Sequence, residues 1–233
     1  MKRQMKPAHT TVISLGGSLI APKEGIDVAF LQGFSALIHA EVKRGRRFVI
    51  ICGGGTTARQ YQAAADKITK ITRDDLDWLG IHATRLNAHL LRTVLRDLAH
   101  PRIITDPHED MPSRRPVIIG AGWRPGCSTD YDAVLLAQRY DADELINLSN
   151  IAYVYDSDPR INKNAVAFEK LDWKRFRKMF GSKWSPGLNS PFDPVASKEA
   201  EKMKLRVIIA EGRDLKNLAR IMDGESFKGT VIS

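Results

Sequence analysis

Short apolar runs alternate with longer amphipathic stretches along the whole chain. Five apolar runs have the length and β-branched content of buried strands: 11–15, 48–52, 117–119, 144–148 and 205–210. Between them, apolar residues recur at intervals of three and four, and this period predicts seven helices: 27–43, 56–67, 74–99, 129–140, 173–180, 194–202 and 215–222. The polar segment 105–116 is predicted to be a loop, and the run 229–232 a final edge strand.

Strands that alternate with helices need crossover connections, and these produce a parallel sheet that is covered on both faces. The predicted fold is therefore α/β, a three-layer αβα sandwich around a mainly parallel central sheet. The only plausible seam, 142–164, does not have the composition of a linker. We expect one domain over 1–233, with an N-terminal lobe of about 1–140 and a C-terminal lobe of about 141–233.

Charge and cysteine content narrow the function classes. The formal net charge is +9, from 36 basic and 27 acidic residues, but the basic residues are scattered and form no recognisable nucleic-acid module. A solvated basic surface is the simpler reading, so no specific nucleic-acid partner and no membrane partner are expected. Cys52 and Cys127 have neither metal-type nor redox-type spacing, and the six histidines are dispersed. A cytoplasmic protein without a zinc site is expected.

Three predicted strands end in glycine clusters: Gly16-Gly17-Ser18, Gly53-Gly54-Gly55 and Gly120-Ala121-Gly122. The carboxyl ends of parallel strands are where ligands bind, and glycine lets backbone amides approach a phosphate closely. One such cluster is as often a plain turn as a site, whereas three in the same position favour phosphate binding. Neither the P-loop pattern nor the dinucleotide pattern G-x-G-x-x-G is present, so another phosphate-binding arrangement is indicated.

Further motifs follow the glycine clusters in a specific order. They are Ala58-Arg59-x-Tyr61, Asp77-x-x-Gly80-Ile81, Ala83-Thr84-Arg85-x-Asn87-Ala88, Pro125-Gly126-x-Ser128-Thr129-Asp130, Asn150-x-x-x-Val154-Tyr155-x-x-Asp158-Pro159 and Asp193-Pro194-x-Ala196. This order is similar to the amino acid kinase superfamily, and within it to the UMP kinases of the archaeal type. The resemblance spans Val12 to Ile232. It implies transfer of the γ-phosphoryl group of ATP to UMP, assisted by Mg²⁺, in a nucleoside monophosphate kinase of pyrimidine biosynthesis.

The resemblance also implies which residues bind each nucleotide. On the ATP side, Gly16, Gly17, Gly55 and Arg59 would contact the phosphates, and Ser149, Asn150, Tyr155 and Asp158 the adenine and ribose. On the UMP side, Gly54 would contact the phosphate and Asp77 the ribose, while the segment Trp123, Arg124, Pro125, Gly126, Cys127, Ser128 and Thr129 would wrap the substrate. Cys127 has no evident basic partner, so a wall residue is expected there and not a nucleophile.

Asp130, Asp193 and Arg59 are implied as the catalytic residues. Phosphoryl transfer depends on in-line placement and on neutralisation of charge, and one carboxylate can hold Mg²⁺ or orient nearby donors. From the residues alone, Asp130 could equally be the N-cap of the helix that follows it. No dedicated protein metal site is expected.

Two departures from the family pattern bear on charge and on the donor pocket. Many members have a lysine two residues before the first loop glycine, where this chain has Ser14. The family segment Asn-Val-Asp-Gly-Val-Tyr is here Asn150-Ile151-Ala152-Tyr153-Val154-Tyr155. Tyr153 in place of glycine implies either that the backbone no longer needs a positive φ or that the ring fills former ATP space.

Two alternatives to a UMP kinase remain open. The scaffold is also similar to the molybdenum storage proteins, so a non-catalytic nucleotide or oxoanion (molybdate or tungstate) binder would fit. A kinase for another small phosphate monoester, such as isopentenyl phosphate, would fit as well. The family commonly forms hexamers built from dimers, so a homo-oligomer is expected.

Overall fold

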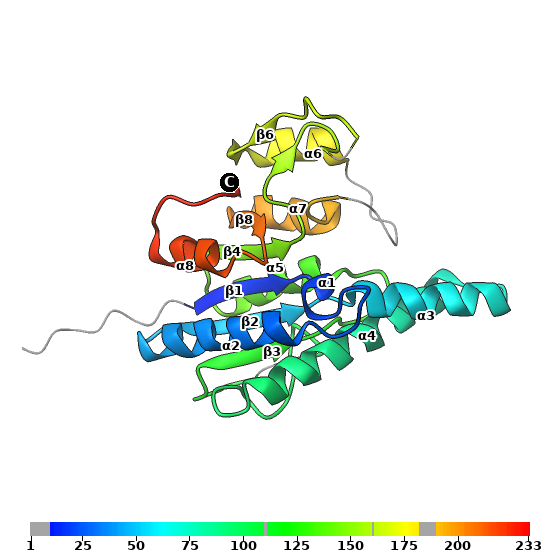
Figure 1. The fold of residues 1–233 in the computed structure, drawn as a ribbon, viewed down its shortest axis with the longest axis horizontal. Helices are drawn as coiled ribbons and strands as arrows, with labels where there is room; N and C mark the ends of the chain where they lie inside the picture. Colours follow the sequence, from blue (N-terminus) through cyan, green and yellow to red (C-terminus); the bar gives the residue numbers. More distant parts are fainter. Residues whose placement is uncertain (1–9, 110, 160, 182–189) are drawn as a thin grey trace, which may run out of the picture.

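The computed structural model describes residues 10–109, 111–159, 161–181 and 190–233 (Figure 1). Its centre is a seven-stranded sheet in the order β3-β2-β1-β4-β8-β9-β7. The strands are β1 (Thr10–Leu15), β2 (Arg47–Cys52), β3 (Val117–Gly120), β4 (Glu144–Ser149), β7 (Lys170–Leu171), β8 (Arg206–Glu211) and β9 (Thr230–Ile232). Every pairing in this sheet is parallel except that of β8 with β9. A small antiparallel ribbon, β5 (Val154–Tyr155) with β6 (Ala167–Phe168), stands beside it.

Eight helices surround the sheet in the described part of the chain. They are α1 (Gly17–Ile20), α2 (Val28–Lys43), α3 (Gly55–Ile68), α4 (Arg73–Val94), α5 (Thr129–Arg139), α6 (Trp173–Phe180), α7 (Pro194–Lys202) and α8 (Leu215–Asp223). Side chains fix where several of them begin. Asp27 accepts a hydrogen bond from Phe30 N at the start of α2, and Thr72 and Asp75 form a capping box at the start of α4.

Alternate residues of each strand enter one of two apolar cores. On β1, Ile13 and Leu15 pack with α2, α4 and α8, whereas Val12 packs on the opposite face with α5 and α7. On β2, Phe48 and Ile50 follow the first pattern. Because successive strand side chains point to opposite faces, continuous apolar runs mean burial on both sides. The predicted three-layer αβα sandwich with a mainly parallel sheet is confirmed.

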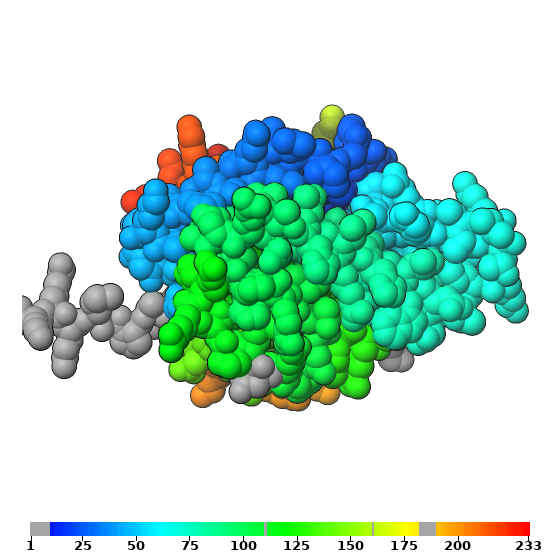
Figure 2. Space-filling model, turned by 90° about the horizontal axis from the view of Figure 1, so that it is seen from below, coloured from blue at the N-terminus to red at the C-terminus, as the bar shows by residue number. Residues whose placement is uncertain are grey.

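The parallel strands end at one edge of the sheet, and the predicted glycine loops lie along it. Gly16 follows β1, Gly53 follows β2, Gly120 ends β3 and Gly212 follows β8. At this edge, α3 and the beginning of α4 project from the body of the molecule, as the cyan segment in Figures 1 and 2 shows. Crossover topology alone therefore collects the loops into one place.

Helix α4 is shorter than the predicted 74–99, so that prediction is wrong at its C-terminal end. The helix ends at Val94, and Ala99 and Ile104 then pair in parallel beside β3. Ala99 remains 1% exposed, because its apolar side chain is buried along the sheet edge and not on a helix. The apolar periodicity therefore predicted the burial of Ala99 correctly, but it predicted the wrong secondary structure for this residue.

The predicted edge strand at 229–232 is also placed wrongly. β9 lies between β8, to which it is antiparallel, and β7, to which it is parallel. The edge position belongs to β7, a two-residue strand too short to predict from its pattern. The strands β5 and β6 and the single-turn helix α1 were likewise not predicted. In the described residues no helix is long and apolar enough to cross a membrane.

Candidate active site at the carboxyl edge of the sheet

The first two glycine loops interlock. A Cβ atom added to Gly17 would lie 2.3 Å from Gly55 N and 2.4 Å from Gly53 O. Gly55 has a φ of +59°, and a Cβ there would lie 2.2 Å from the Gly17 carbonyl carbon. No side chain fits at either position, so the two backbones touch. The glycines that the sequence assigned to phosphate contact thus also hold the β1 and β2 loops against each other.

Helix α4 fixes two of the glycine loops through side chains to which no role was assigned from the sequence. Asn87 donates from Nδ2 to Gly53 O at 2.8 Å, and Thr84 Oγ1 accepts from Gly122 N at 2.8 Å. Both side chains are buried. Their signal in the sequence was a polar residue on the apolar face of a helix, because a buried polar group needs a specific partner.

Arg59 projects from the first turns of α3 toward the β1 loop. Its Nη2 donates to Ser18 Oγ at 3.2 Å and to Thr56 Oγ1 at 3.0 Å. The residue is exposed, and the two hydroxyls are weak, neutral partners that a phosphate can replace. The guanidinium therefore lies where the first two glycine loops meet.

Asp130, in α5, contacts two strands and the start of another helix at the centre of this edge. Its Oδ1 accepts from Ser14 Oγ at 3.0 Å and from Asn147 Nδ2 at 2.8 Å, so it bridges β1 and β4. Its Oδ2 accepts from Asp193 N at 3.2 Å, at the start of α7. The N-cap of α5 is Ser128, whose Oγ accepts from Tyr131 N. The alternative reading of Asp130 as an N-cap is therefore wrong.

The two central carboxyl groups are poorly solvated. Burial, reinforced by the charge of Asp193, raises the pKa of Asp130 to about 6, although Ser14, Asn147 and the Asp193 amide oppose the shift. Burial also raises the pKa of Asp193. Asp193 caps α7 through Oδ1, which accepts from Ala196 N at 2.7 Å. Its buried Oδ2 finds no hydrogen-bond donor among the described residues.

Ser14 occupies the position of the expected lysine without supplying a charge. It is 5% exposed, and its hydroxyl is committed to Asp130. A lysine there would place a cation beside Asp130 and lower its pKa, whereas a hydroxyl stabilises the carboxylate only by one hydrogen bond. The Ser14 hydroxyl lowers the pKa of Asp130, against the larger effect of burial.

The predicted acceptor segment, 123–129, is hydrogen-bonded to α4 through Asp77 and Arg85. Asp77 Oδ2 accepts from Gly126 N at 2.8 Å, and Gly126 has a φ of +80° at the top of the bend after Pro125. Asp77 was predicted to contact a ribose; here it anchors the segment. Burial raises the pKa of Cys127, which disfavours a thiolate nucleophile. Thr129 is the first residue of α5, one position before Asp130.

The predicted donor residues line a cavity of about 450 Å³ on the other side of β4. Ser149, Asn150, Tyr155 and Asp158 all contribute to its walls, together with Ala152 and Tyr153. The Tyr153 and Tyr155 rings meet edge to face, with centroids 6.3 Å apart. The non-glycine residues of the described chain with positive φ are Asp141 and Lys204, so Tyr153 has an ordinary backbone. Its ring forms part of the cavity wall.

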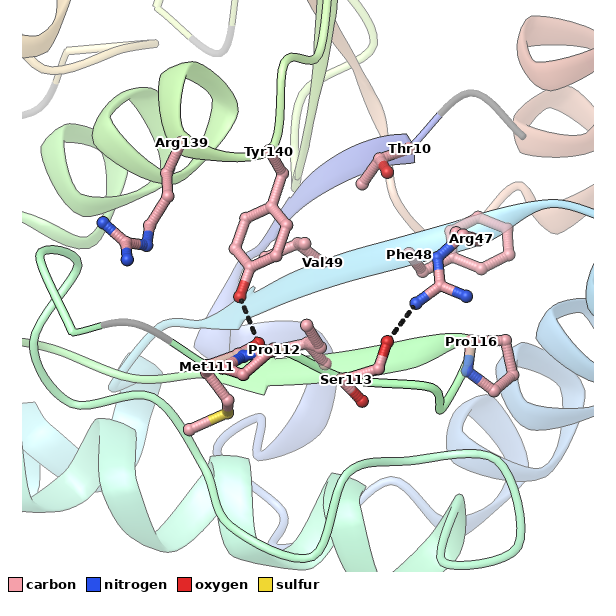
Figure 3. Close-up of a pocket in the computed structure, with 11 residues that line it drawn as sticks. Thr10, Arg47, Phe48, Val49, Met111, Pro112, Ser113, Pro116, Arg139 and Tyr140 are labelled. Atoms are coloured by element: carbon pink, nitrogen blue, oxygen red, sulfur yellow. Dashed lines mark hydrogen bonds between the residues drawn. The ribbon is translucent and has the colours of Figure 1, made fainter. Parts of the chain in front are cut away.

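A second cavity, of about 540 Å³, lies at the opposite, amino edge of the sheet (Figure 3). Arg47 and Tyr140 project into it, but their polar atoms bond to the neighbouring loop. Arg47 Nη2 donates to Ser113 O at 2.8 Å, and Tyr140 Oη donates to Met111 O at 3.3 Å. These bonds join the loop to β2 and α5. The phosphate-binding candidates all lie at the other edge.

Comparisons with known proteins agree with this geometry. The profile of the "Amino acid kinase family" matches residues 9–211. The chain belongs to the amino acid kinase family. Among curated members of this family, a uridylate kinase of Thermoplasma volcanium is 37% identical over 220 residues, covering 93% of this chain and 94% of the relative. A uridylate kinase of Methanococcus maripaludis strain C6 is 34% identical over 226 residues, covering 95% and 98%.

A solved structure in the family has the same fold. The crystal structure of uridylate kinase from Archaeoglobus fulgidus superposes with a TM-score of 0.79 at 30% identity, covering 96% of this chain and 99% of that one. The superposition therefore extends over nearly the whole of both chains. Departures such as Ser14 and Tyr153 are thus local changes inside an intact family fold.

Proposed function

We propose that this protein is a uridylate kinase, which transfers the γ-phosphoryl group of ATP to UMP and releases UDP and ADP. The observation that carries the proposal is the position of Asp130. Its carboxylate lies between β1, β4 and the start of α7, and Asp130 directly follows the acceptor segment 123–129 in the chain. The full-length similarity to uridylate kinases supports this substrate class.

We further propose a division of labour along the chain. The acceptor half, about 1–140, binds UMP with Gly54, Asp77 and the segment 123–129. The donor half, about 141–233, binds the adenosine of ATP with Ser149, Asn150, Tyr155 and Asp158 in the cavity beside β4. The glycines at 16, 17 and 55 cradle the transferring phosphates between the halves, because their amides can approach oxygen atoms closely.

The residues at the centre act by placement and charge. Arg59 moves its guanidinium from Ser18 and Thr56 to phosphate oxygens and offsets their negative charge. Asp130, fixed by Ser14 and Asn147, orients the start of α7 and thereby Asp193. With a pKa of about 6, Asp130 is mostly ionised at pH 7 and above.

The residues present fit a Mg²⁺ ion that arrives with ATP. Asp193 Oδ2 is a buried oxygen without a donor among the described residues, and Mg²⁺ prefers oxygen ligands. Among the residues that the structure describes, no cluster of three or more metal-ligating side chains occurs. Nucleotide phosphates and water would therefore supply most of the ligands. The ion would neutralise the phosphates that lysine neutralises elsewhere in the family.

A coupled assay that follows ADP release tests the proposal directly. UMP, CMP, dUMP and isopentenyl phosphate are compared as acceptors at saturating Mg·ATP. Phosphorylation of UMP with the highest kcat/KM is expected. No turnover with any acceptor in a folded protein would overturn the kinase assignment, and preference for another acceptor would overturn the choice of UMP.

The oxoanion-storage alternative has a different signature. Purified protein would carry stoichiometric molybdenum or tungsten, detectable by elemental analysis, and would not turn over ATP.

We propose that the protein is cytoplasmic and that it forms a homo-oligomer. The oligomer is proposed because the family fold commonly assembles and because α4 exposes apolar side chains such as Leu86 and Trp78. Light scattering measures the mass of the assembly.

A further inference from the structure

Asp132 is a buried carboxyl group that the proposed chemistry does not use. It lies in the first turn of α5, two residues after Asp130, and is 1% exposed. Its Oδ2 accepts from Trp123 N at 3.1 Å, whereas its buried Oδ1 finds no donor among the described residues. A buried polar atom without a partner is costly, so an apolar residue would serve a purely structural position better.

Trp123, the partner of Asp132, is the first residue of the acceptor segment and is held from several sides. Its carbonyl accepts from Arg85 Nη2 at 3.0 Å. The Arg124 guanidinium lies 3.9 Å from the centre of its ring, and the His108 ring lies 4.8 Å away on a centroid basis. These contacts therefore hold Trp123 in one position at the start of the acceptor segment.

The acceptor segment has two carboxylate anchors, one at its first residue and one at its middle. Asp77 holds Gly126 from α4, at an accessible position, and Asp132 holds Trp123 from α5, inside the protein. Asp132 and Asp130 share one helical turn. The anchor of the acceptor segment and the centre of the site are thus parts of one rigid helix, so the distance between them is fixed.

We propose that Asp132 is a positioning residue for the acceptor: through the Trp123 amide it sets where the segment 123–129 lies relative to Asp130. The inference rests on the proposed function for its kinetic consequence. Asp132 touches no reacting atom; it acts through the backbone of Trp123. Its loss should weaken the acceptor site and leave the donor cavity beyond β4 unaffected.

Two substitutions separate the hydrogen bond from the charge. Asp132→Asn keeps an oxygen that can accept from Trp123 N, whereas Asp132→Leu keeps the approximate shape and removes the acceptor. Because losing one hydrogen bond at a positioned loop corresponds to roughly tenfold in affinity, the leucine variant should raise the KM for UMP about tenfold. The asparagine variant should raise it less than about threefold, and the KM for ATP should stay within about twofold in both.

Glu41→Gln is the matched control. Glu41 is a buried carboxylate in α2, paired with Arg44 and Arg46 far from the acceptor segment. The control should lower stability without changing the KM for UMP. KM does not depend on the fraction of active enzyme, so a merely structural loss in Asp132→Leu would lower kcat alone. Asp132→Ala serves as the variant without an acceptor if the leucine protein does not fold.

A second readout is independent of the substrate. Hydrogen–deuterium exchange over 123–129 should be faster in the leucine variant than in the wild type, and close to wild type in the asparagine variant. Unchanged exchange in the leucine variant would overturn the inference, and so would an unchanged KM for UMP in a wild type that phosphorylates UMP. A wild type that does not phosphorylate UMP overturns the proposed function alone, and the exchange data then decide the inference.

Discussion

The burial of Asp132 makes the stability of this protein depend on pH in a way that one substitution should remove. Burial raises the pKa of this carboxyl from 3.8 to about 7, opposed chiefly by the Trp123 amide. Asp132→Asn has nearly the same shape, keeps an acceptor for Trp123 N and cannot ionise. The substitution therefore removes the buried charge and little else.

The sign and size follow from linkage. A carboxyl whose pKa is raised by folding contributes its stability fully below the unfolded pKa, near 3.8, and loses it as pH rises through the folded value, about 7. At pH 5 Asp132 is still protonated in the folded protein. At pH 8 it is mostly ionised there, and the buried charge destabilises the folded state. Between these pH values the wild type should lose roughly 2–3 kcal/mol of unfolding free energy through Asp132.

Urea denaturation of the ligand-free protein at pH 5 and pH 8 measures this difference. The free energy of unfolding of Asp132→Asn, relative to wild type, should rise by roughly 2–3 kcal/mol from pH 5 to pH 8. Other groups titrate in both proteins and largely cancel in the comparison. Equal pH dependence of the two proteins would refute the reasoning, since it would mean that Asp132 is solvated or already ionised at low pH.

Three further predictions concern the site itself. Asp130→Asn should lower kcat by a factor of about 100 or more with the circular dichroism spectrum unchanged, because its carboxylate joins Ser14, Asn147 and Asp193; an unaffected kcat would show that the centre is misassigned. Gly17→Ala should abolish turnover and lower Tm, because the added methyl would meet Gly55 N at 2.3 Å; wild-type Tm would contradict the interlocked loops. Tyr153→Ala should raise the KM for ATP about threefold or more, since it removes one aromatic wall of the donor cavity, with Tyr153→Phe as the control; the two variants having equal KM values would show that the ring makes no contact with ATP.

Local patterns in the sequence were sufficient for most of the fold. The helices at 173–180 and 194–202 begin and end where their apolar periodicity predicts, and every buried strand of the parallel core was found. Those patterns reflect interactions within a few residues and burial on both faces, and both leave a periodic record. The glycine clusters were likewise visible, because a glycine after a strand has a local meaning.

Other features depend on contacts between residues far apart in the chain, and only the tertiary structure decides them. Ala99 carries the helical apolar signal but lies beside β3, and β9 is enclosed by β7, whose two residues carry no pattern. The sequence analysis assigned no role to Asp132, which lies in the first turn of α5. Its burial against the Trp123 amide arises from packing between α5 and the acceptor segment, which no local pattern records.

The candidate site also has features that the sequence predicts and features that only the tertiary structure shows. Asp130 is predicted as a site residue because of its place in a motif, but only the structure shows its partners Ser14 and Asn147, which come from β1 and β4. The sequence alone predicted which residues would bind phosphate, and it determined the fold that brings the strand ends together. The tertiary structure decided which of those groups are buried, paired or left with a free oxygen, because solvation and hydrogen bonding depend on neighbours that the linear chain keeps far apart.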